Sequence, residues 1–445
     1  MYNLDYQNKL ISASEAVKLV KSGDRIQYSE FVMFPSTLDA ALAERIHELK
    51  DLNLRGVCFT KVPKVVAADP NREHIVMEDY HFGTVSRRLC ERDLCNYVPM
   101  TYHQGPRLIR KSIDIDVVFV LTGPMDHQGF FNLGLSNSVM PAVLSKAKKI
   151  IVEVNRKVPI CLGGNQESIH ISRVDHIVES DNDPIASLPP GSYSDTDCKI
   201  AHHVMQEIED GACLQLGIGG LPNAVGSLIA ESDLQDLGVH TEMFADSYVD
   251  LYQKGRITNN KKNIDKYKMC YTFAMGSQKL YDFMDNNPIC ASYPANYTND
   301  PRIIALNDKV VAINNALEVD LYSQVYSESA GTKQISGTGG QLDFIFGAYN
   351  SHGGKGLICL SSTYKAADGS MQSRINPTLS PGSIVTLPRS LVHYVITEYG
   401  TAMLKGMSTW QRAEALIKIA HPSFRDSLIQ SAEDMHLWTK TNKIS

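Results

Sequence analysis

A strand followed by a turn and a helix occurs once in each half of the chain, and this repeat is the strongest constraint on the fold. In the first half, a strand at residues 25–29 leads through a turn at residues 35–37 into a helix at residues 38–49. In the second half, a strand at residues 212–216 leads through a glycine turn and Pro222 into a helix at residues 224–230. Proline at such a helix entry is common because its fixed φ suits the first turn. The repeat predicts two halves of similar fold.

Two apolar runs between these units, residues 115–121 and 149–154, are typical of strands buried in a parallel sheet. A helix at residues 141–147 would join them as a βαβ unit. The chain has 445 residues, which exceeds one ordinary core, so two domains are expected. The polar, proline-rich segment 180–192 is the best linker candidate. The sequence therefore predicts an α/β protein of two similar open, mostly parallel domains, residues 1–190 and residues 191–445.

Further elements follow from local patterns. Ser12 and Glu15 form a capping box that opens a helix. Additional strands are expected at residues 303–305, 310–313, 357–360 and 392–396. The segment 410–432 is expected to be helical except around Pro422.

Glu242 is the first candidate catalytic residue. A short strand is predicted at residues 237–241, which places Glu242 at its carboxyl end, where open α/β sheets bind their ligands. The glycine turn, residues 217–221, would let a ligand approach bare amides at the start of a helix. A second glycine cluster, residues 336–344, would aim backbone donors at a developing negative charge. A carboxylate held dry beside such donors can attack an activated acyl group and form a covalent acyl-enzyme.

Each of these features also has an ordinary explanation. A glutamate at a strand end is usually solvated or ion-paired, and a glycine turn is usually only a turn. The order and combination of the three features favour the catalytic interpretation. The first half has bulky residues at positions 30–34 where the second half has glycines. We therefore predict that a nucleotide-like ligand binds the second half.

Composition excludes several other classes of protein. Apolar residues make up 43% and charged residues 21%, and the formal charge of -6 provides no basic surface for nucleic acid. The 9 cysteines include no C-x-x-C pair, so we expect reduced thiols and no metal site. The start of the chain lacks a basic segment followed by an apolar one, and no stretch approaches the roughly 20 apolar residues of a membrane helix. A cytoplasmic protein that binds a small molecule and no membrane is expected.

Several longer segments carry a family resemblance that covers nearly the whole chain. In the first half they are residues 152–155 and 169–175. In the second half they are residues 217–222, 241–243, 312–321, 336–344, 395–400 and 419–422. As a set these segments resemble the acetyl-CoA hydrolase/transferase branch of the CoA-transferases, most closely the 4-hydroxybutyrate and butyryl-CoA:acetate CoA-transferases. The resemblance implies the CoA-transferase fold.

The resemblance also implies an activity. CoA would pass from a short-chain acyl-CoA (butyryl-, propionyl- or 4-hydroxybutyryl-CoA) to acetate without ATP, as in fermentation. Glu242 matches the family's nucleophile: its attack would give a mixed anhydride and CoA thiolate, and the thiolate would then form a glutamyl-CoA thioester. Acetate would reverse these steps in a ping-pong cycle from which water is kept out. CoA is a substrate here, no permanently bound cofactor is expected, and a homo-oligomer is possible.

The resemblance assigns further site residues by position. The residues that match the family's CoA-binding turn are Gly217, Ile218, Gly219, Gly220 and Leu221. Gly340 matches an amide donor to CoA and to the thioester oxyanion, and Asn315 matches a CoA contact. Lys365 is favoured over Lys355 for the CoA phosphates because it follows its strand, at the end where ligands gather. The first-half turn, residues 29–35, is expected to face Glu242 and shape the acyl pocket.

Three alternatives remain at this point. An acyl-CoA hydrolase would use the same Glu242 but admit water to the intermediate. A non-catalytic acyl-CoA sensor would share the fold, because fold alone does not determine function. A dinucleotide dehydrogenase has little support, since Pro222 occupies the last position of the G-x-G-x-x-G pattern.

Overall fold

The computed structural model of the chain describes residues 2–188 and 191–437. The chain forms two compact units. The first comprises the described residues up to 188 together with Glu242–Phe244 and Lys268–Thr298, and the second comprises the other described residues. The predicted domain boundary at residue 190 lies outside the described residues. The units nevertheless differ from two continuous domains, because Glu242, which we placed in the second domain, contacts mainly residues of the first.

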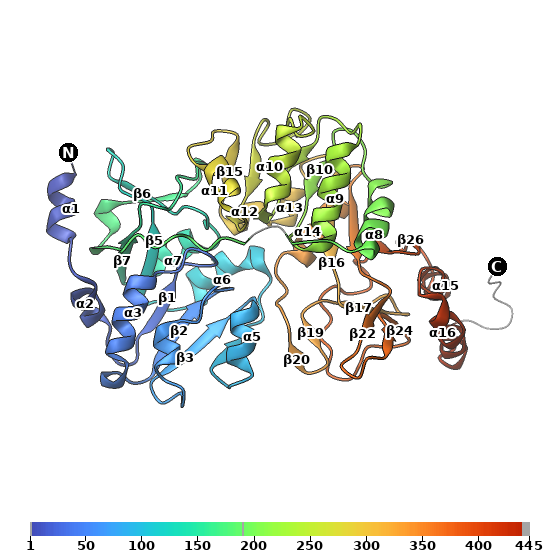
Figure 1. Cartoon of the computed structure of the whole chain (residues 1–445), viewed down its shortest axis with the longest axis horizontal. Helices are drawn as coiled ribbons and strands as arrows, with labels where there is room; N and C mark the ends of the chain where they lie inside the picture. The colour runs from blue at the N-terminus through green and yellow to red at the C-terminus, as the bar shows by residue number, and fades with distance from the viewer. Residues whose placement is uncertain (1, 189–190, 438–445) are drawn as a thin grey trace. The chain divides into compact units, whose positions relative to one another are not determined.

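A sheet of 7 strands forms the centre of the first unit (Figure 1), and every pairing in it is parallel. Across the sheet the strands are β4 (Cys95–Tyr97), β3 (Ile75–Asp79), β2 (Leu52–Gly56), β1 (Arg25–Tyr28), β5 (Val117–Thr122), β7 (Lys149–Val154) and β9 (His176–Glu179). The chain builds outward from β1 on one side and then from β5 on the other. Strand order therefore reverses between β1 and β5, which is where open α/β sheets form a ligand crevice.

Helices and short strand pairs complete the first unit. The helices are α1 (Asn3–Lys9), α2 (Ala13–Ala16), α3 (Ser36–Glu44), α4 (Lys64–Ala67), α5 (Thr84–Cys90), α6 (Gly105–Ser112), α7 (Met140–Lys146), α11 (Gln278–Met284) and α12 (Ala295–Thr298). The short pairs are β6 (Phe130–Asn132) with β8 (Ser168–His170), β12 (Met243–Phe244) with β14 (Phe273–Ala274), and β13 (Met269–Tyr271) with β15 (Cys290–Ser292). Leu38, Leu42 and Leu89 of the helices pack with Leu54 and Val117 of the sheet in one buried core.

The second unit is built on the same plan around 6 strands. Across its sheet the strands are β11 (Gly238–Val239), β10 (Cys213–Gln215), β16 (Val310–Asn315), β21 (Lys355–Cys359), β25 (Tyr394–Thr397) and β26 (Gly400–Met403). Only the last pairing is antiparallel. Strand order reverses between β10 and β16, as it does between β1 and β5. The predicted fold of mostly parallel α/β halves is confirmed.

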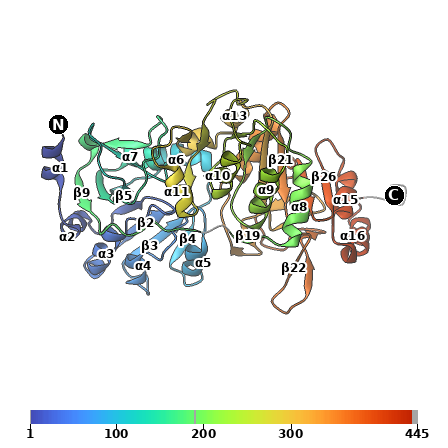
Figure 2. The ribbon, with the colours of Figure 1, turned by 45° about the horizontal axis from the view of Figure 1, so that its top comes forward.

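The helices of the second unit are α8 (Asp195–Met205), α9 (Gly220–Glu231), α10 (Asp246–Gln253), α13 (Pro301–Ile304), α14 (Gln341–Asn350), α15 (Thr409–Lys418) and α16 (Pro422–Asp434). In Figures 1 and 2, α8 and α9 lie side by side, and so do α15 and α16. The small strands are β17 (Glu318–Asp320), β18 (Val325–Tyr326), β19 (Ser329–Ala330), β20 (Lys333–Gln334), β22 (Thr363–Lys365), β23 (Met371–Ser373) and β24 (Ile375–Asn376). No helix among the described residues is long and apolar enough to cross a bilayer.

One predicted element is wrong. Residues 303–305, expected as a strand, belong to the end of α13 and the residue after it. The Asp300 carboxylate accepts the backbone N–H of Arg302 at 2.9 Å, and Pro301 occupies the first turn. This is a helix start. The apolar Ile304 is fully buried, which explains why a strand was expected.

Candidate active site

Glu242 directly precedes a short strand that belongs to the first unit. Its backbone carbonyl accepts the N–H groups of Thr272 (3.0 Å) and Phe273 (3.3 Å). The following residues form β12, which pairs in parallel with β14 through Met243 and Phe273. The Glu242 residue is partly exposed. The backbone is thus held in place by hydrogen bonds while the residue stays partly exposed.

A loop before α7 holds β14 from its other side. The carbonyl of Thr272 accepts the N–H groups of Asn137 (3.1 Å) and Ser138 (3.0 Å), and the N–H of Ala274 donates to Leu135 at 2.8 Å. Within the first unit these three chain segments therefore lie side by side. Residues 272–274 lie between residues 135–138 and residues 242–244. This arrangement explains why Glu242 groups with residues more than a hundred positions earlier in the sequence.

The first-half turn, residues 29–35, reaches the same place. Phe31 stacks on Phe273, with ring centroids 3.7 Å apart and an interplanar angle of 8°. Both rings are almost fully buried. Phe31 has φ 57, a left-handed conformation that costs a non-glycine residue roughly 1–3 kcal/mol and is typical of functional sites. The turn thus contacts the strand next to Glu242.

The glycine turn of the second unit follows β10. The N–H of Leu216, at its start, donates to the buried Tyr248 hydroxyl at 2.6 Å. A Cβ added to Gly217 or Gly219 would meet no protein atom within 4 Å, and Gly219 has φ +117. Ile218 is 46% exposed. Helix α9 begins at Gly220, earlier than predicted, so the turn leaves open space at a helix N-terminus, where backbone amides bind anions.

The second glycine cluster lies beside the neighbouring strand. Gly340 precedes the first turn of α14. The Gln341 side chain donates to the carbonyl of Asn315 at 2.7 Å and accepts from Ser327 at 2.8 Å. Asn315 is the last residue of β16, which pairs with β10. The structure therefore brings Gly340 and Asn315 together at the carboxyl end of β16, next in the sheet to the strand that leads into the Gly217 turn.

The two candidate lysines differ. The Lys355 ammonium binds the Glu207 carboxylate at 3.0 Å, so it is already engaged. Lys365 is exposed in the β22–β23 hairpin, and no hydrogen bond or ion pair joins its ammonium to another residue of the described chain. The structure shows no contact between Lys365 and Gly217, Asn315 or Gly340. Its assignment to the CoA phosphates stays a prediction.

Two family models match the chain. The acetyl-CoA hydrolase/transferase N-terminal domain matches residues 1–189, and the acetyl-CoA hydrolase/transferase C-terminal domain matches residues 276–432. The chain belongs to the acetyl-CoA hydrolase/transferase family. The predicted family is therefore confirmed.

Relatives that are named for an activity indicate which class of enzyme within this family the chain belongs to. The chain is 51% identical to the butyryl-CoA:acetate CoA-transferase of Anaerostipes caccae over 99% of both chains. It is 48% identical to a probable butyrate:acetyl-CoA coenzyme A-transferase of Syntrophomonas wolfei, over 99% of this chain and 98% of that one. The crystal structure of RipA from Yersinia pestis superimposes with a TM-score of 0.89 at 38% identity, over 98% and 99% of the two chains. This family member is an enzyme with CoA-transferase activity.

Three other polar side chains in the segments that resemble the family have structural partners. Glu398 accepts both the N–H (2.8 Å) and the hydroxyl (2.6 Å) of Ser362. His170 binds the Ser172 hydroxyl at 2.8 Å, and Asp175 accepts the N–H of Ile150 at 2.7 Å. These contacts account for the three side chains without a catalytic role.

Sequence reasoning missed a group of polar residues beside Glu242. Glu30, Tyr80, Tyr102 and Ser138 form a buried hydrogen-bonded cluster in the first unit. Residues 30–34 were interpreted as bulk that keeps a nucleotide-like ligand from the first half, and the turn at residues 29–35 as a wall of the acyl pocket, but no role was assigned to Glu30 itself. The available signal was that Glu30 follows a predicted strand directly and therefore lies at the carboxyl end of β1, at the reversal of strand order.

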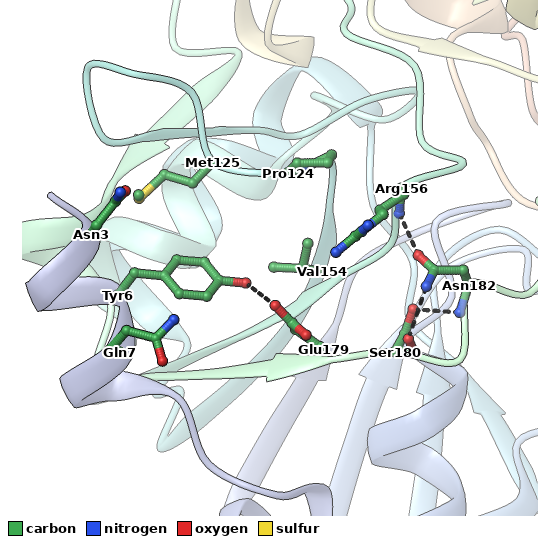
Figure 3. Close-up of a pocket in the computed structure, with 10 residues that line it drawn as sticks. All are labelled: Asn3, Tyr6, Gln7, Pro124, Met125, Val154, Arg156, Glu179, Ser180 and Asn182. Carbon is green, nitrogen blue, oxygen red and sulfur yellow. Dashed lines mark hydrogen bonds between the residues drawn. The ribbon is translucent and has the colours of Figure 1, made fainter.

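A surface pocket of about 240 Å³ also lies in the first unit (Figure 3). It opens where α1 meets the ends of β7 and β9. Tyr6 donates to Glu179 at 3.0 Å, and Asn182 accepts the N–H of Arg156 at 2.7 Å. None of the predicted site residues lines this pocket, and its exposed walls carry both an arginine and a glutamate, so they select no single ligand charge.

Proposed function

We propose that this enzyme transfers CoA from a short-chain acyl-CoA to acetate, with butyryl-, propionyl- and 4-hydroxybutyryl-CoA as candidate donors. The observation that carries the proposal is the 51% identity, across 99% of both chains, to a butyryl-CoA:acetate CoA-transferase. A relative at 39% identity is named a 4-hydroxybutyrate coenzyme A transferase, which supports including that donor.

In the proposed mechanism, a Glu242 oxygen attacks the thioester carbon and the C–S bond breaks. The products of this step are a mixed anhydride and CoA thiolate. The thiolate then attacks the glutamyl carbon, the donor acid leaves as its carboxylate, and a glutamyl-CoA thioester remains. Acetate attacks this thioester and the steps run in reverse, which gives ping-pong kinetics. The fixed backbone of Glu242 supports this role because only its side chain is left to move.

Roles in CoA binding are proposed for residues 217–221, Asn315, Gly340 and Lys365. The open space above Gly217 and Gly219 supports the first of these, since a nucleotide could approach the amides of α9 closely. The Gly340 amide is proposed to donate to CoA and to the thioester oxyanion. The role of Lys365 is proposed because its side chain is exposed and follows β21 in the chain.

Trapping the intermediate tests the mechanism. The enzyme is incubated with butyryl-CoA, treated with borohydride, and digested for peptide mass mapping. We expect the Glu242 carboxyl to be reduced to an alcohol only when acyl-CoA is present. The Glu242→Gln variant should show no reduced residue at position 242. Its transfer rate should be lower than that of the wild type by roughly a thousandfold or more. The matched control is Glu398→Gln, which should still label at Glu242. Label at another residue, or none in the wild type, contradicts the mechanism.

Acceptor dependence separates the transferase from the hydrolase. CoA exchange to acetate is measured from butyryl-, propionyl-, 4-hydroxybutyryl- and succinyl-CoA, with and without acetate. A transferase should release little free CoA when the acid is absent. Release of free CoA at the same rate without any acid acceptor would instead identify a hydrolase.

A further inference from the structure

Asn137 is a fully buried residue of the first unit that binds two chain segments at once. It lies in the loop before α7. Its side-chain amide donates to the backbone carbonyl of Ser292 at 3.1 Å, and its backbone N–H donates to the carbonyl of Thr272 at 3.1 Å. Ser292 is the last residue of β15, and Thr272 lies between β13 and β14. One asparagine therefore joins β15 to the residue from which β14 begins.

Thr272 connects Asn137 to Glu242 through the backbone. Its carbonyl accepts from Asn137, and its own N–H donates to the Glu242 carbonyl at 3.0 Å. The preceding residue, Tyr271, pairs with Ser292, to which the Asn137 amide is bound. Asn137 therefore holds the residue that binds Glu242 in two ways, directly and through β15.

The loop that carries Asn137 is strained. Ser138, the next residue, has φ 46, a left-handed conformation that is unfavourable for a residue other than glycine. Its N–H donates to the Thr272 carbonyl at 3.0 Å, and its carbonyl accepts the N–H of Ala295 at 2.8 Å. Such strain is typical of functional sites, where the surrounding contacts overcome it. These contacts hold the loop in one conformation against Thr272.

A second loop, which contains Gly163, packs against the strand that Asn137 binds. A Cβ added to Gly163 would lie 2.1 Å from the Ser292 carbonyl oxygen, so only glycine allows this approach. The Ser292 N–H donates to the Leu162 carbonyl at 2.8 Å, and the Asn137 amide nitrogen also donates to the Asn165 carbonyl at 3.4 Å. The carbonyl group that accepts from Asn137 is therefore itself fixed in place.

Stability alone does not explain an asparagine at this position. The Asn137 side-chain oxygen is buried and has no hydrogen-bond partner among the described residues, and the same holds for the hydroxyls of Ser136 and Thr272. Burying polar atoms without partners lowers stability. Three such atoms in the segments that hold Glu242 indicate that these side chains serve the position of Glu242 rather than stability.

We infer that Asn137 is a positioning residue for the reaction: with its side chain on Ser292 and its N–H on Thr272, it sets the position of the Glu242 backbone. This inference rests on the proposed function, because it takes Glu242 as the nucleophile. Misplacing a reacting group by about 1 Å can slow a reaction roughly a hundredfold. Glu242 reacts in both half-reactions of the proposed cycle, so both should slow together when Asn137 is changed.

The test replaces the Asn137 amide and measures each half-reaction. Asn137→Asp keeps the shape of the side chain but, once ionised, has no hydrogen to donate to Ser292. We expect kcat to fall roughly ten- to a hundredfold, while KM for acyl-CoA and KM for acetate change by less than about threefold. Formation of the glutamyl-CoA thioester and its reaction with acetate, followed in single turnovers, should slow by the same factor. If Asn137→Asp does not fold, Asn137→Ala decides the question, because it removes the donor without placing a charge in the core.

Asn132→Asp is the matched control. Asn132 is also buried, its amide donates to the Cys161 carbonyl at 3.0 Å, and its side-chain oxygen accepts the N–H groups of Gly134 and Cys161. The substitution removes the same kind of hydrogen bond from the same unit, at a side chain whose bonds within the described chain do not reach Thr272 or Ser292. Its kcat should stay within about threefold of the wild-type value.

Three kinetic results would overturn the inference: an unchanged kcat in the Asn137 variant, an equal fall of kcat in Asn132→Asp, or a KM that rises as much as kcat falls. Borohydride labelling separates this inference from the proposed function. Absence of label at Glu242 in the wild type defeats the proposed function, whereas normal label in the wild type with any of the three kinetic results defeats only the role of Asn137.

Discussion

At the scale of single residues, Gly217 is the clearest case in which the absence of a side chain matters. The Cβ of a larger residue would meet no protein atom within 4 Å, so nothing in the fold requires glycine there. A ligand that approaches the backbone amides would require it.

We expect Gly217→Val to raise KM for acyl-CoA roughly tenfold through collision with the ligand, while the free energy of unfolding changes by about 0.5 kcal/mol or less. Steady-state kinetics and urea unfolding measure the two effects. Gly123→Ala is a control in the first unit, where the new Cβ would make an ordinary contact with the Val158 carbonyl at 3.5 Å. A Gly217 variant with unchanged KM would remove this turn from the CoA site.

Glu242 could be proposed as the nucleophile from sequence because it follows a predicted strand and accompanies two glycine turns. The surroundings of Glu30 could not be predicted, although it also follows a strand. Its partners Tyr80 and Ser138 lie 50 and 108 positions away. No local pattern indicates that two hydroxyl groups so distant in sequence will bind one carboxylate.

At the scale of elements, α10 supports the start of the glycine turn. The Tyr248 hydroxyl on this helix accepts the N–H of Leu216 and donates to the Leu216 carbonyl at 3.3 Å. Leu216 and Tyr248 are both fully buried. A helix that comes after the turn in sequence therefore sets the exit direction of β10.

Tyr248→Phe should leave the buried Leu216 N–H without a partner, at a cost of about 1–3 kcal/mol in the free energy of unfolding. We also expect KM for acyl-CoA to rise, because the turn at Gly217 begins at the next residue. Denaturant unfolding and kinetics test both effects. The control is Tyr252→Phe on the same helix, whose ring is 37% exposed. An unchanged KM in Tyr248→Phe would show that the turn holds its shape without this bond.

Most elements could be predicted because their signals are local. The buried strands β5 and β7 and the capping box of Ser12 and Glu15 are observed as predicted. The strand expected at residues 303–305 failed because burial of Ile304 outweighed the helix-start signal of Asp300 and Pro301. Periodicity cannot distinguish a short buried helix from a short buried strand.

At the scale of the whole molecule, the carboxyl groups whose pKa burial raises most lie in the first unit. Burial raises the pKa of Glu30, Asp79 and Glu153 to about 7 and that of Asp39 to about 6. A folded pKa above the unfolded value means that the folded unit binds more protons. The stability that these four groups contribute is therefore fully present below the ordinary carboxyl pKa. It is lost as the pH rises toward 7.

We expect the opening free energy of the first unit to fall by about 2 kcal/mol for each such group between pH 5 and pH 8. Hydrogen exchange read peptide by peptide, corrected for intrinsic rates, measures each unit separately. The second unit, where burial raises the pKa of Glu318 and Asp320 as well, is the internal comparison and should show the weaker pH dependence. Asp79→Asn should reduce the pH dependence of the opening free energy of the first unit by the part that Asp79 contributes. Equal pH dependence in both units would contradict the expectation.

Sequence alone determined the family, the two mostly parallel α/β halves and the choice of Glu242, because strand patterns, glycine turns and family segments are local in the chain. Only the tertiary structure decided that Glu242 is anchored in the first unit, against the Phe31 turn and residues 135–138. It alone also decided that Glu30 accepts from Tyr80 and Ser138 and that Tyr102 binds Ser138. Burial and hydrogen bonding join residues far apart in sequence, and the free energy of those contacts exists only once the chain has folded.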